Sequence, residues 1–175
     1  MSTCPFCDSE NIEGADECDA CGLPLDDMHL TPPTTEVERS LLRDRVSVLV
    51  PRPVLKVPPT MPVGQVLGLL ADNEVGCAVV AHGNRPVGIF SERDALNKLN
   101  ADAAALAAHP VSEYMTPNPI TLVASAKVAY AVERMHVQGC RHLPIVDGAG
   151  ELVGIISARD ILRYLKTRLS RDAAE

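Results

Sequence analysis

The stretch Val87-Gly88-Ile89-Phe90-Ser91-Glu92-Arg93-Asp94 returns 66 residues later as Val153-Gly154-Ile155-Ile156-Ser157-Ala158-Arg159-Asp160. The same offset holds further upstream, because Val57 falls on Val123 and Val79-Val80 falls on Ile145-Val146. A period of this length indicates one supersecondary unit that is built twice. Any site that the unit carries is therefore expected twice.

Both copies predict the same order of elements. A proline-bounded segment precedes a short strand at Val57 or Val123, and an amphipathic helix follows that strand. Two strands joined by a glycine-bearing hairpin come next, and a final helix opens at Ser91 or Ser157. The sequence thus predicts an α/β (α+β) fold with the order β-α-β-β-α twice, the two repeats being related by a pseudo-two-fold axis.

The segments around this pattern predict further divisions of the chain. Prolines within residues 26–35 indicate a linker, and Thr35 with Glu38 forms a capping-box pattern that predicts a helix continuing to Pro51. The first closing helix is expected to run through the alanine-rich residues 101–108, with low-complexity disorder as the alternative. The chain is expected to divide into a small N-terminal domain at 1–25, a linker with a helix at 26–43, repeats at 44–109 and 110–170, and a tail at 171–175.

Four cysteines near the N-terminus form two C-x-x-C pairs, Cys4 with Cys7 and Cys18 with Cys21. Two such turns can complete a tetrahedral shell of thiolates around one Zn²⁺, and Gly22 suits a turn with positive φ. The segment resembles the short zinc-ribbon family, whose members end in C-x-x-C-G-x-x-L. A segment this short has almost no apolar core, so a bound metal is expected to supply its folding energy.

Iron held by the same thiolates, a redox dithiol and unmetallated thiols are the other interpretations of these cysteines. Rubredoxin-type iron sites usually carry more aromatic residues than Phe6 alone, and a redox pair is expected in a thioredoxin-like setting that this sequence lacks. A closed shell of protein ligands leaves no position for catalysis, so the metal is expected to be structural. Cys77 and Cys140 are expected to be a buried and a partly buried thiol.

The composition argues against several classes of protein. The net charge is −7 with a pI near 5.2, which disfavours sequence-independent binding to nucleic acid. No apolar run reaches the roughly 18 residues needed to cross a bilayer, so no membrane contact is expected. No signal peptide is visible, and the expected compartment is the cytoplasm, where thiols stay reduced.

The repeated pattern resembles the CBS domain, here as a tandem pair of the Bateman type. The second copy is the fuller match, because the first has Gly76-Cys77-Ala78 in place of the family's His-Leu-Pro stretch. The matching stretches of the second copy are Tyr114-Met115-Thr116-Pro117, Arg141-His142-Leu143-Pro144-Ile145-Val146-Asp147 and Gly154-Ile155-Ile156-Ser157-Ala158-Arg159-Asp160.

Pairs of this family commonly bind adenosyl ligands such as AMP, ATP or S-adenosylmethionine, and the resemblance implies which residues would hold one. Ser91 and Ser157 open helices whose free N–H groups attract phosphate. Asp94 and Asp160, one turn later, can each accept hydrogen bonds from two ribose hydroxyls. The residues expected to form an apolar slot for adenine are Val54, Val79, Val80, Ile120, Ile145 and Val146. Arg141 and His142 are expected at its mouth, near the phosphates.

The expected function is therefore a cytoplasmic regulator that binds an adenine nucleotide or S-adenosylmethionine. It is not expected to be an enzyme, because its two aspartates belong to separate sites and do not form one acid–base pair. The resemblance also implies a homodimer, and the ribbon is expected to dock an unidentified protein. Because Ser-x-x-Asp is also a plain helix cap, a ligand-independent adaptor is the alternative, with a zinc-ribbon nucleic-acid binder as a third class.

Overall fold

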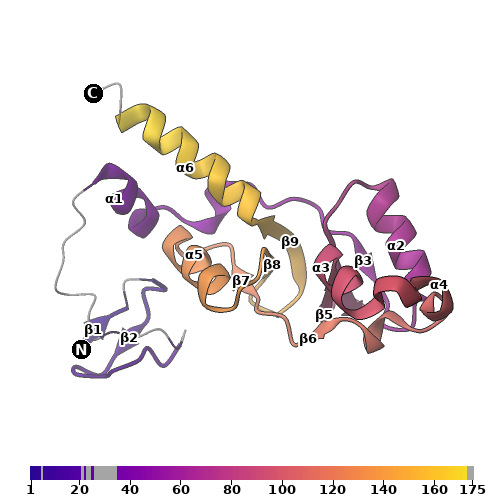
Figure 1. Ribbon diagram of the computed structural model, residues 1–175. Helices are drawn as coiled ribbons and strands as arrows, with labels where there is room; N and C mark the ends of the chain where they lie inside the picture. Colours follow the sequence, from indigo (N-terminus) through magenta and orange to yellow (C-terminus); the bar gives the residue numbers. More distant parts are fainter. Residues whose placement is uncertain (5, 21, 23–24, 26–34, 173–175) are drawn as a thin grey trace. The chain divides into compact units, whose positions relative to one another are not determined.

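The computed structural model describes residues 1–4, 6–20, 22, 25 and 35–172 (Figure 1). Cys21 and most of the predicted linker lie outside the described residues. The chain forms two compact units: unit 1 comprises residues 1–50, 124–141 and 157–175, and unit 2 comprises residues 51–123 and 142–156. In the part of the chain that is described, no helix is long and apolar enough to cross a membrane.

Unit 2 contains one β-sheet from each repeat. The strands of the first sheet are, in spatial order, β3 (Lys56–Val57), β4 (Cys77–His82), β5 (Arg85–Ser91) and β6 (Thr116–Pro117). Those of the second sheet are β7 (Leu122–Val123), β8 (His142–Val146) and β9 (Leu152–Ser157). In both repeats the first strand is parallel to the second, so the predicted α/β fold and its order of strands are confirmed.

Each sheet also receives the leading segment of the other repeat, which the sequence did not predict. β6 opens the second repeat, yet it pairs antiparallel with β5 of the first repeat, with Thr116 opposite Ile89. Arg52 belongs to the leading segment of the first repeat and forms the corresponding antiparallel bridge with Ile155 of β9. The two backbone hydrogen bonds of that bridge both measure 3.0 Å between nitrogen and oxygen.

A glycine at the same position of each repeat makes room for this exchange. A Cβ atom at Gly88 would lie 2.1 Å from Sδ of Met115, in the segment that leads into the second repeat. A Cβ atom at Gly154 would lie 2.9 Å from Cβ of Pro51, in the segment that leads into the first. The repeated Val-Gly-Ile sequence therefore reflects a close approach between chain segments.

Helix α2 (Val63–Asp72) packs against β4 and contributes Val63, Val66 and Leu70 to a core that is almost wholly aliphatic. The predicted continuous closing helix is wrong, because α3 (Glu92–Asp94) continues as a π-helical turn and a separate α4 (Ala103–Leu106) follows. The chain breaks at Asn100, whose φ is 44°. The alternative of disorder is also wrong, because this stretch is helical and α4 packs on α2.

Unit 1 contains α1 (Glu36–Arg43), α5 (Val128–Val137) and α6 (Ala158–Asp172), and α1 packs against the other two. The predicted capping box is confirmed, because Thr35 N donates to Glu38 Oε2 at 3.0 Å and Glu38 N donates to Thr35 Oγ1 at 3.1 Å. The helix ends well before Pro51, because Asp44 adopts an extended backbone.

The carboxylate of Asp44 joins the end of α1 to α6. It accepts hydrogen bonds from the Tyr164 hydroxyl, at 2.9 Å, and from Arg168. Burial opposes its ionisation, but the hydrogen bonds from Tyr164 and Arg43 and the charge of Arg168 hold the pKa of Asp44 below its ordinary value. These contacts hold Asp44 at the end of α1, and their partners lie far along the sequence.

We expect Gly154→Ala to lower the free energy of unfolding by about 1–3 kcal/mol, because the added methyl group meets a proline ring and a backbone oxygen. Gly88→Ala should cost less, because the obstructing atoms belong to the flexible side chain of Met115. Urea unfolding followed by circular dichroism measures both. Gly148→Ala is the control, since no heavy atom lies within 4 Å of its added Cβ; equal stability of Gly154→Ala and this control would contradict the explanation.

Candidate functional site

A buried carboxylate stands where β5 passes into α3. Asp94 is 9% exposed, and its Oδ2 accepts hydrogen bonds from Ser91 N at 3.0 Å and Ser91 Oγ at 2.6 Å. Its Oδ1 lies 2.7 Å from Lys98 Nζ and accepts a hydrogen bond from Thr116 Oγ1 at 3.0 Å. The carboxylate is thus held by the serine before the helix, by the helix itself and by β6 of the other repeat.

These contacts keep Asp94 ionised. Burial raises its pKa, but hydrogen bonds from Lys98 and Ser91 and the charge of Lys98 outweigh that effect, and the pKa lies below its ordinary value. A negative charge is therefore present in a largely buried position at neutral pH. An ionised carboxylate is an acceptor only, so any ligand group that replaces Lys98 or Thr116 on Oδ1 must be a donor.

Two residues of the second repeat reach this junction. Thr116 does so through the exchange of leading segments, and His142 does so from the start of β8. A Cβ atom at Gly76 would lie 3.4 Å from both the His142 ring and the Glu92 carboxylate, and the Gly76 carbonyl oxygen accepts a hydrogen bond from Glu92 N at 3.1 Å. His142, which belongs to the second repeat, therefore lies beside the helix start that leads to Asp94 in the first.

The second repeat builds the same cap at the start of α6. Asp160 is 5% exposed, and its Oδ2 accepts hydrogen bonds from Ser157 N at 2.8 Å and Ser157 Oγ at 2.7 Å. Arg163 Nη1 donates to Oδ1 at 3.2 Å. The exposed Arg141 lies at the same helix start, because its carbonyl oxygen accepts a hydrogen bond from Ala158 N at 2.8 Å.

The residues predicted to form an apolar slot differ in their burial. Val79, Val80 and Ile145 are fully buried, and Val80 belongs to the hydrophobic core of unit 2. Val54, Ile120 and Val146 are half-buried, so these three offer the surface that a flat base can contact. The paired Ser-x-x-Asp motif predicted the two caps, whereas Thr116 was missed as a site residue although it lies in the Met-Thr-Pro stretch that carries the family resemblance.

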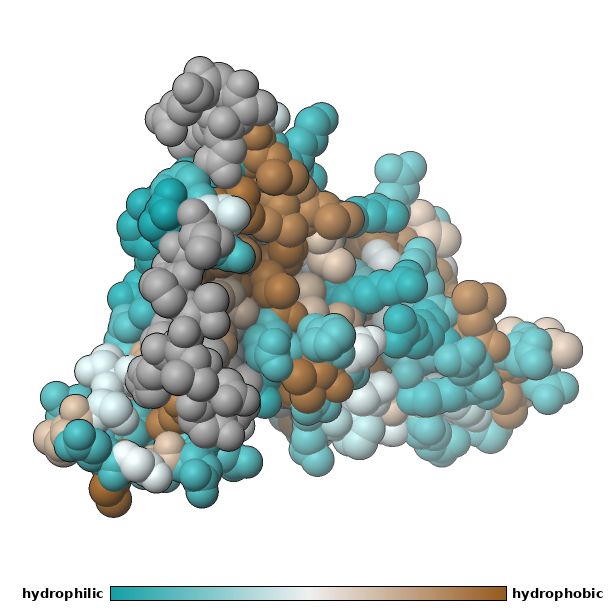
Figure 2. All heavy atoms as spheres, turned by 60° about the vertical axis from the view of Figure 1, so that its left-hand side comes forward, coloured by the Kyte–Doolittle hydropathy of each residue, from teal (hydrophilic) through white to brown (hydrophobic). Residues whose placement is uncertain are grey.

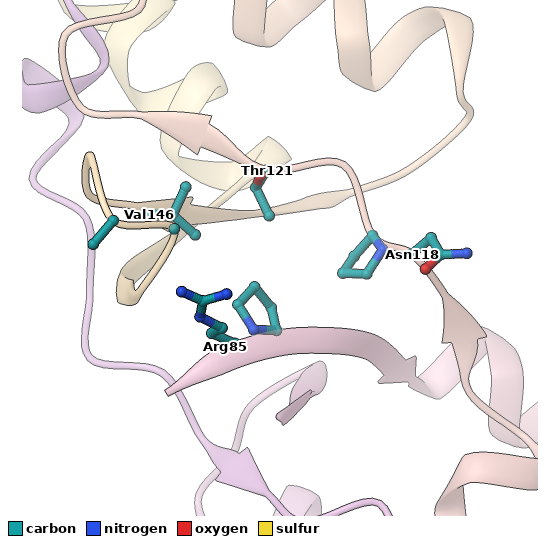
Figure 3. A pocket seen from close by; sticks show the side chains of 8 residues that line it. Arg85, Asn118, Thr121 and Val146 are labelled. Carbon is teal, nitrogen blue, oxygen red and sulfur yellow. The ribbon is translucent and has the colours of Figure 1, made fainter. Parts of the chain in front are cut away.

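A cavity of about 370 Å³ lies in unit 2 between the two hairpins (Figure 3). Arg85 extends from the start of β5 towards Val146, and Thr121 faces the same space from the segment before β7. Neither the serines nor the aspartates of the two caps line it. Its volume falls near the lower end for small-molecule sites, whereas the buried, ionised carboxylate of Asp94 lies outside it.

The N-terminal segment folds as a pair of similar turns beside a short hairpin of β1 (Ser2–Thr3) and β2 (Glu10–Asn11). In the first turn Asp8 N donates to Cys4 O at 2.9 Å, and in the second Gly22 N donates to Cys18 O at 2.7 Å. Asp8 and Gly22 follow the two C-x-x-C pairs and have φ values of 60° and 66°. The positive φ predicted at Gly22 is confirmed.

The sulfur atoms of these turns converge. Those of Cys4, Cys7 and Cys18 all lie within 4.8 Å of one another, and Cys7 Sγ is 3.6 Å from Cys18 Sγ. Sulfurs at the corners of a tetrahedral Zn²⁺ site, with Zn–S bonds near 2.3 Å, are separated by about 3.8 Å. The donor set therefore fits a thiolate-bound metal, and the predicted fourth ligand, Cys21, lies outside the described residues.

The other two cysteines have the burial that the sequence predicted. Cys77 is 5% exposed, and burial together with the negative charge of Glu92 raises its pKa to about 12. The thiol is therefore protonated at neutral pH and unsuited to nucleophilic chemistry. Cys140 is half-buried.

The exchanged leading segments show that the chain is a tandem pair of α/β domains. Each domain has a Ser–Asp cap where its last strand passes into a helix. Residues 46–101 and 111–167 each match the CBS domain. The chain belongs to the CBS-domain family.

Relatives of this chain support that assignment over the same region. An uncharacterized 17.7 kDa protein of Acidianus ambivalens is 33% identical over 123 residues, which cover 69% of this chain and 73% of that protein. A solved structure of a CBS domain protein from Pyrobaculum aerophilum, complexed with AMP, is 36% identical with a TM-score of 0.61 and covers 71% of this chain and 99% of that one.

Inosine-5'-monophosphate dehydrogenase of Thermoplasma acidophilum is 29% identical over 135 residues, which are 77% of this chain but only 26% of the enzyme. The likeness is thus to a small part of that protein. The dehydrogenase activity is a property of that enzyme as a whole, of which the match covers about a quarter.

We expect acid to remove the stabilisation that Asp94 supplies. Because its folded-state pKa is depressed, this stabilisation is complete above the ordinary aspartate value near 4 and is lost as the pH falls through the folded-state value. Asp94→Asn should lower the free energy of unfolding by about 1–2 kcal/mol at pH 6, and the difference from the parent should shrink towards pH 3. Urea titrations at several pH values measure this. Asp72→Asn, at the exposed end of α2, is the control; a pH-independent loss in Asp94→Asn would contradict the assignment.

Proposed function

We propose that the chain is a regulatory sensor that binds an adenine nucleotide of the AMP type through the Ser–Asp caps of its two CBS repeats. The observation that carries this proposal is the buried, ionised Asp94, held by Ser91 and Thr116 where the two repeats meet. Burying a charged group costs free energy, because burial alone favours the neutral form. Buried charged groups with specific partners are therefore candidates for functional sites.

The chemistry of the junction matches the ribose and phosphate of a nucleotide. The Oδ1 atom of Asp94 accepts hydrogen bonds only, so it suits the ribose hydroxyls, which would replace Lys98 and Thr116 there. His142, beside Gly76, is a donor that can face a phosphate oxygen. The AMP bound to the relative from Pyrobaculum aerophilum, at 36% identity, supports this class of ligand, with S-adenosylmethionine as the alternative adenosyl compound.

A ligand-independent adaptor is the competing function, and one observation favours it. Without any ligand, Oδ1 of Asp94 already contacts Lys98 and Thr116, and Oδ2 already accepts two hydrogen bonds from Ser91. This carboxylate is therefore stable as a helix cap. The site of Asp160 is proposed to bind more tightly for a different reason, because the second repeat is the fuller match to the family from Arg141 to Asp160.

We expect AMP at a hundred times its Kd to stabilise the protein by about 2.7 kcal/mol per site, which raises Tm by roughly 5–10 °C. Removing one carboxylate should weaken binding about ten- to a hundredfold, with a larger loss in Asp160→Ala than in Asp94→Ala. Thermal shift and calorimetric titration measure these effects. Asp72→Ala is the charge control. If the double variant Asp94→Ala/Asp160→Ala folds and still responds to AMP like the parent, the carboxylates are caps only and the adaptor function replaces the sensor.

We further propose that Cys4, Cys7, Cys18 and Cys21 bind one structural Zn²⁺. The convergence of three sulfurs and the matching backbone turns support this site. The bound metal would supply folding energy to a segment whose core consists of Cys4, Cys18 and Leu25 with a few half-buried neighbours.

Protein purified with zinc supplied is expected to contain about one Zn²⁺ per chain, as a closed thiolate site requires. Plasma emission spectrometry measures the metal, and Cys18→Ser should lose most of it. Cys77→Ser, at a buried thiol outside the cluster, should keep it. Metal-free parent protein would rule out the site, and a coloured protein containing iron would correct the metal.

We propose that the sensor acts as a homodimer in the cytoplasm and regulates an unidentified partner. Figure 2 shows apolar side chains gathered along α6, where Leu162 and Leu169 are exposed on the same helix face. A second copy would bury this face. Size-exclusion chromatography with light scattering tests the dimer.

A further inference from the structure

The ribbon, meaning the described residues of the segment 1–25, packs on one stripe of α5. Tyr130 and Arg134 are spaced four residues apart on one face of the helix, and Lys127 is the residue that precedes its first turn. Tyr130 packs against the core that contains Cys4 and Cys18. All of these residues belong to unit 1.

The stripe contacts both metal-binding turns. Lys127 Nζ lies 2.5 Å from Asp8 Oδ1, and Lys127 N donates to Phe6 O at 3.3 Å, both in the first turn. Arg134 lies at the second turn, where a Cβ atom on Gly22 would be 3.7 Å from its Nη2. The Arg134 guanidinium also stacks 5.0 Å from the centre of the Tyr130 ring.

Asp8 is the central residue of this contact. Its Oδ2 pairs with Arg45 Nη2 at 2.5 Å, and Arg45 Nη1 in turn donates to the Ser125 carbonyl oxygen at 3.0 Å, just before α5. One carboxylate therefore joins the first metal-binding turn to both sides of the start of α5.

The backbone conformation at position 8 favours glycine, so the aspartate found there is explained by the contacts of its side chain. With φ at 60° it occupies the left-handed region that favours glycine, and the equivalent position of the second turn is Gly22, with φ at 66°. Glycine would thus form the first turn with less strain. A carboxylate stands there instead, and it holds two cations, Lys127 of the second CBS repeat and Arg45 of the segment that follows α1.

From these contacts we propose that metal binding to the ribbon is coupled to the stability of α5 through Asp8. Bound metal fixes the turn that positions the Asp8 carboxylate, and the carboxylate fixes Lys127 and Arg45 at the start of the helix. By thermodynamic reciprocity, the same contact raises the affinity of the ribbon for its metal. This coupling rests on the proposed metal site. It means that metal binding would change the stability of a helix of the second CBS repeat.

Asp8→Gly is the test variant, because glycine retains the turn and removes only the carboxylate. The full-length protein is prepared with Zn²⁺ and after chelation, and amide hydrogen exchange is followed over residues 128–137. In the parent, we expect chelation to speed exchange of these amides by about fivefold or more, the lower end of ordinary coupling. In Asp8→Gly, we expect fast exchange with and without Zn²⁺, and a Zn²⁺ affinity about fivefold lower in competition with a chromophoric chelator.

Asp19→Ala is the matched control. It removes an exposed acid next to Cys18 in the other turn, and it keeps the hydrogen bond that the Asp19 backbone nitrogen donates to Asn11 Oδ1 at 3.0 Å. It should retain the metal-dependent protection of α5. Failure to bind Zn²⁺ would overturn the metal site itself, whereas stoichiometric Zn²⁺ with no change in α5 exchange on chelation would overturn the coupling alone. Identical behaviour of Asp8→Gly and Asp19→Ala would show that charge near the thiolates, and not the contact with α5, sets the metal affinity.

Discussion

The reciprocal crossing of the two leading segments is the constraint on which unit 2 depends. β6 lies on β5, and Arg52 lies on β9, so each sheet is completed by chain from the other repeat. The crossing needs a backbone without side chains at the point of contact, and Gly88 and Gly154 provide it. Close-packed interiors do not adjust to an extra methyl group without cost, so the requirement is strict at Gly154, where the added atom meets a proline and a backbone oxygen, and weaker at Gly88, where it meets a flexible side chain.

The same crossing decides which residues can act together. Because β6 runs along β5, the hydroxyl of Thr116 reaches Asp94 across the boundary between repeats. His142 arrives beside Gly76 at the same junction. The candidate site at Asp94 is thus composite, and a ligand bound there would contact both repeats at once. This is the property that a sensor needs if occupancy is to change how its parts are held.

Much of this arrangement could be predicted from the sequence, and the failures have specific causes. The 66-residue period and the Ser-x-x-Asp pairs predicted the strands, the middle helices and both caps, because these features are local. The exchange of leading segments could not be predicted, since a strand as short as β6 has no hydrophobic periodicity. The early end of α1 was also missed, and the partners of Asp44 at that end, Tyr164 and Arg168, lie on a helix that is distant in sequence. The helix break at Asn100 was missed because the alanine-rich residues 101–108 that follow it favour a helix.

The exchange of leading segments also bears on how such a chain can arise. A single repeat on its own would form a sheet that lacks the strand supplied by the other repeat. The unpaired N–H and C=O groups at such an edge can pair with another chain. Two identical copies could complete each other reciprocally, which is the geometry of a domain-swapped dimer. The tandem chain joins those two copies covalently. The same reciprocal completion therefore occurs within one polypeptide, with Arg52 opposite Ile155 in one sheet and Thr116 opposite Ile89 in the other.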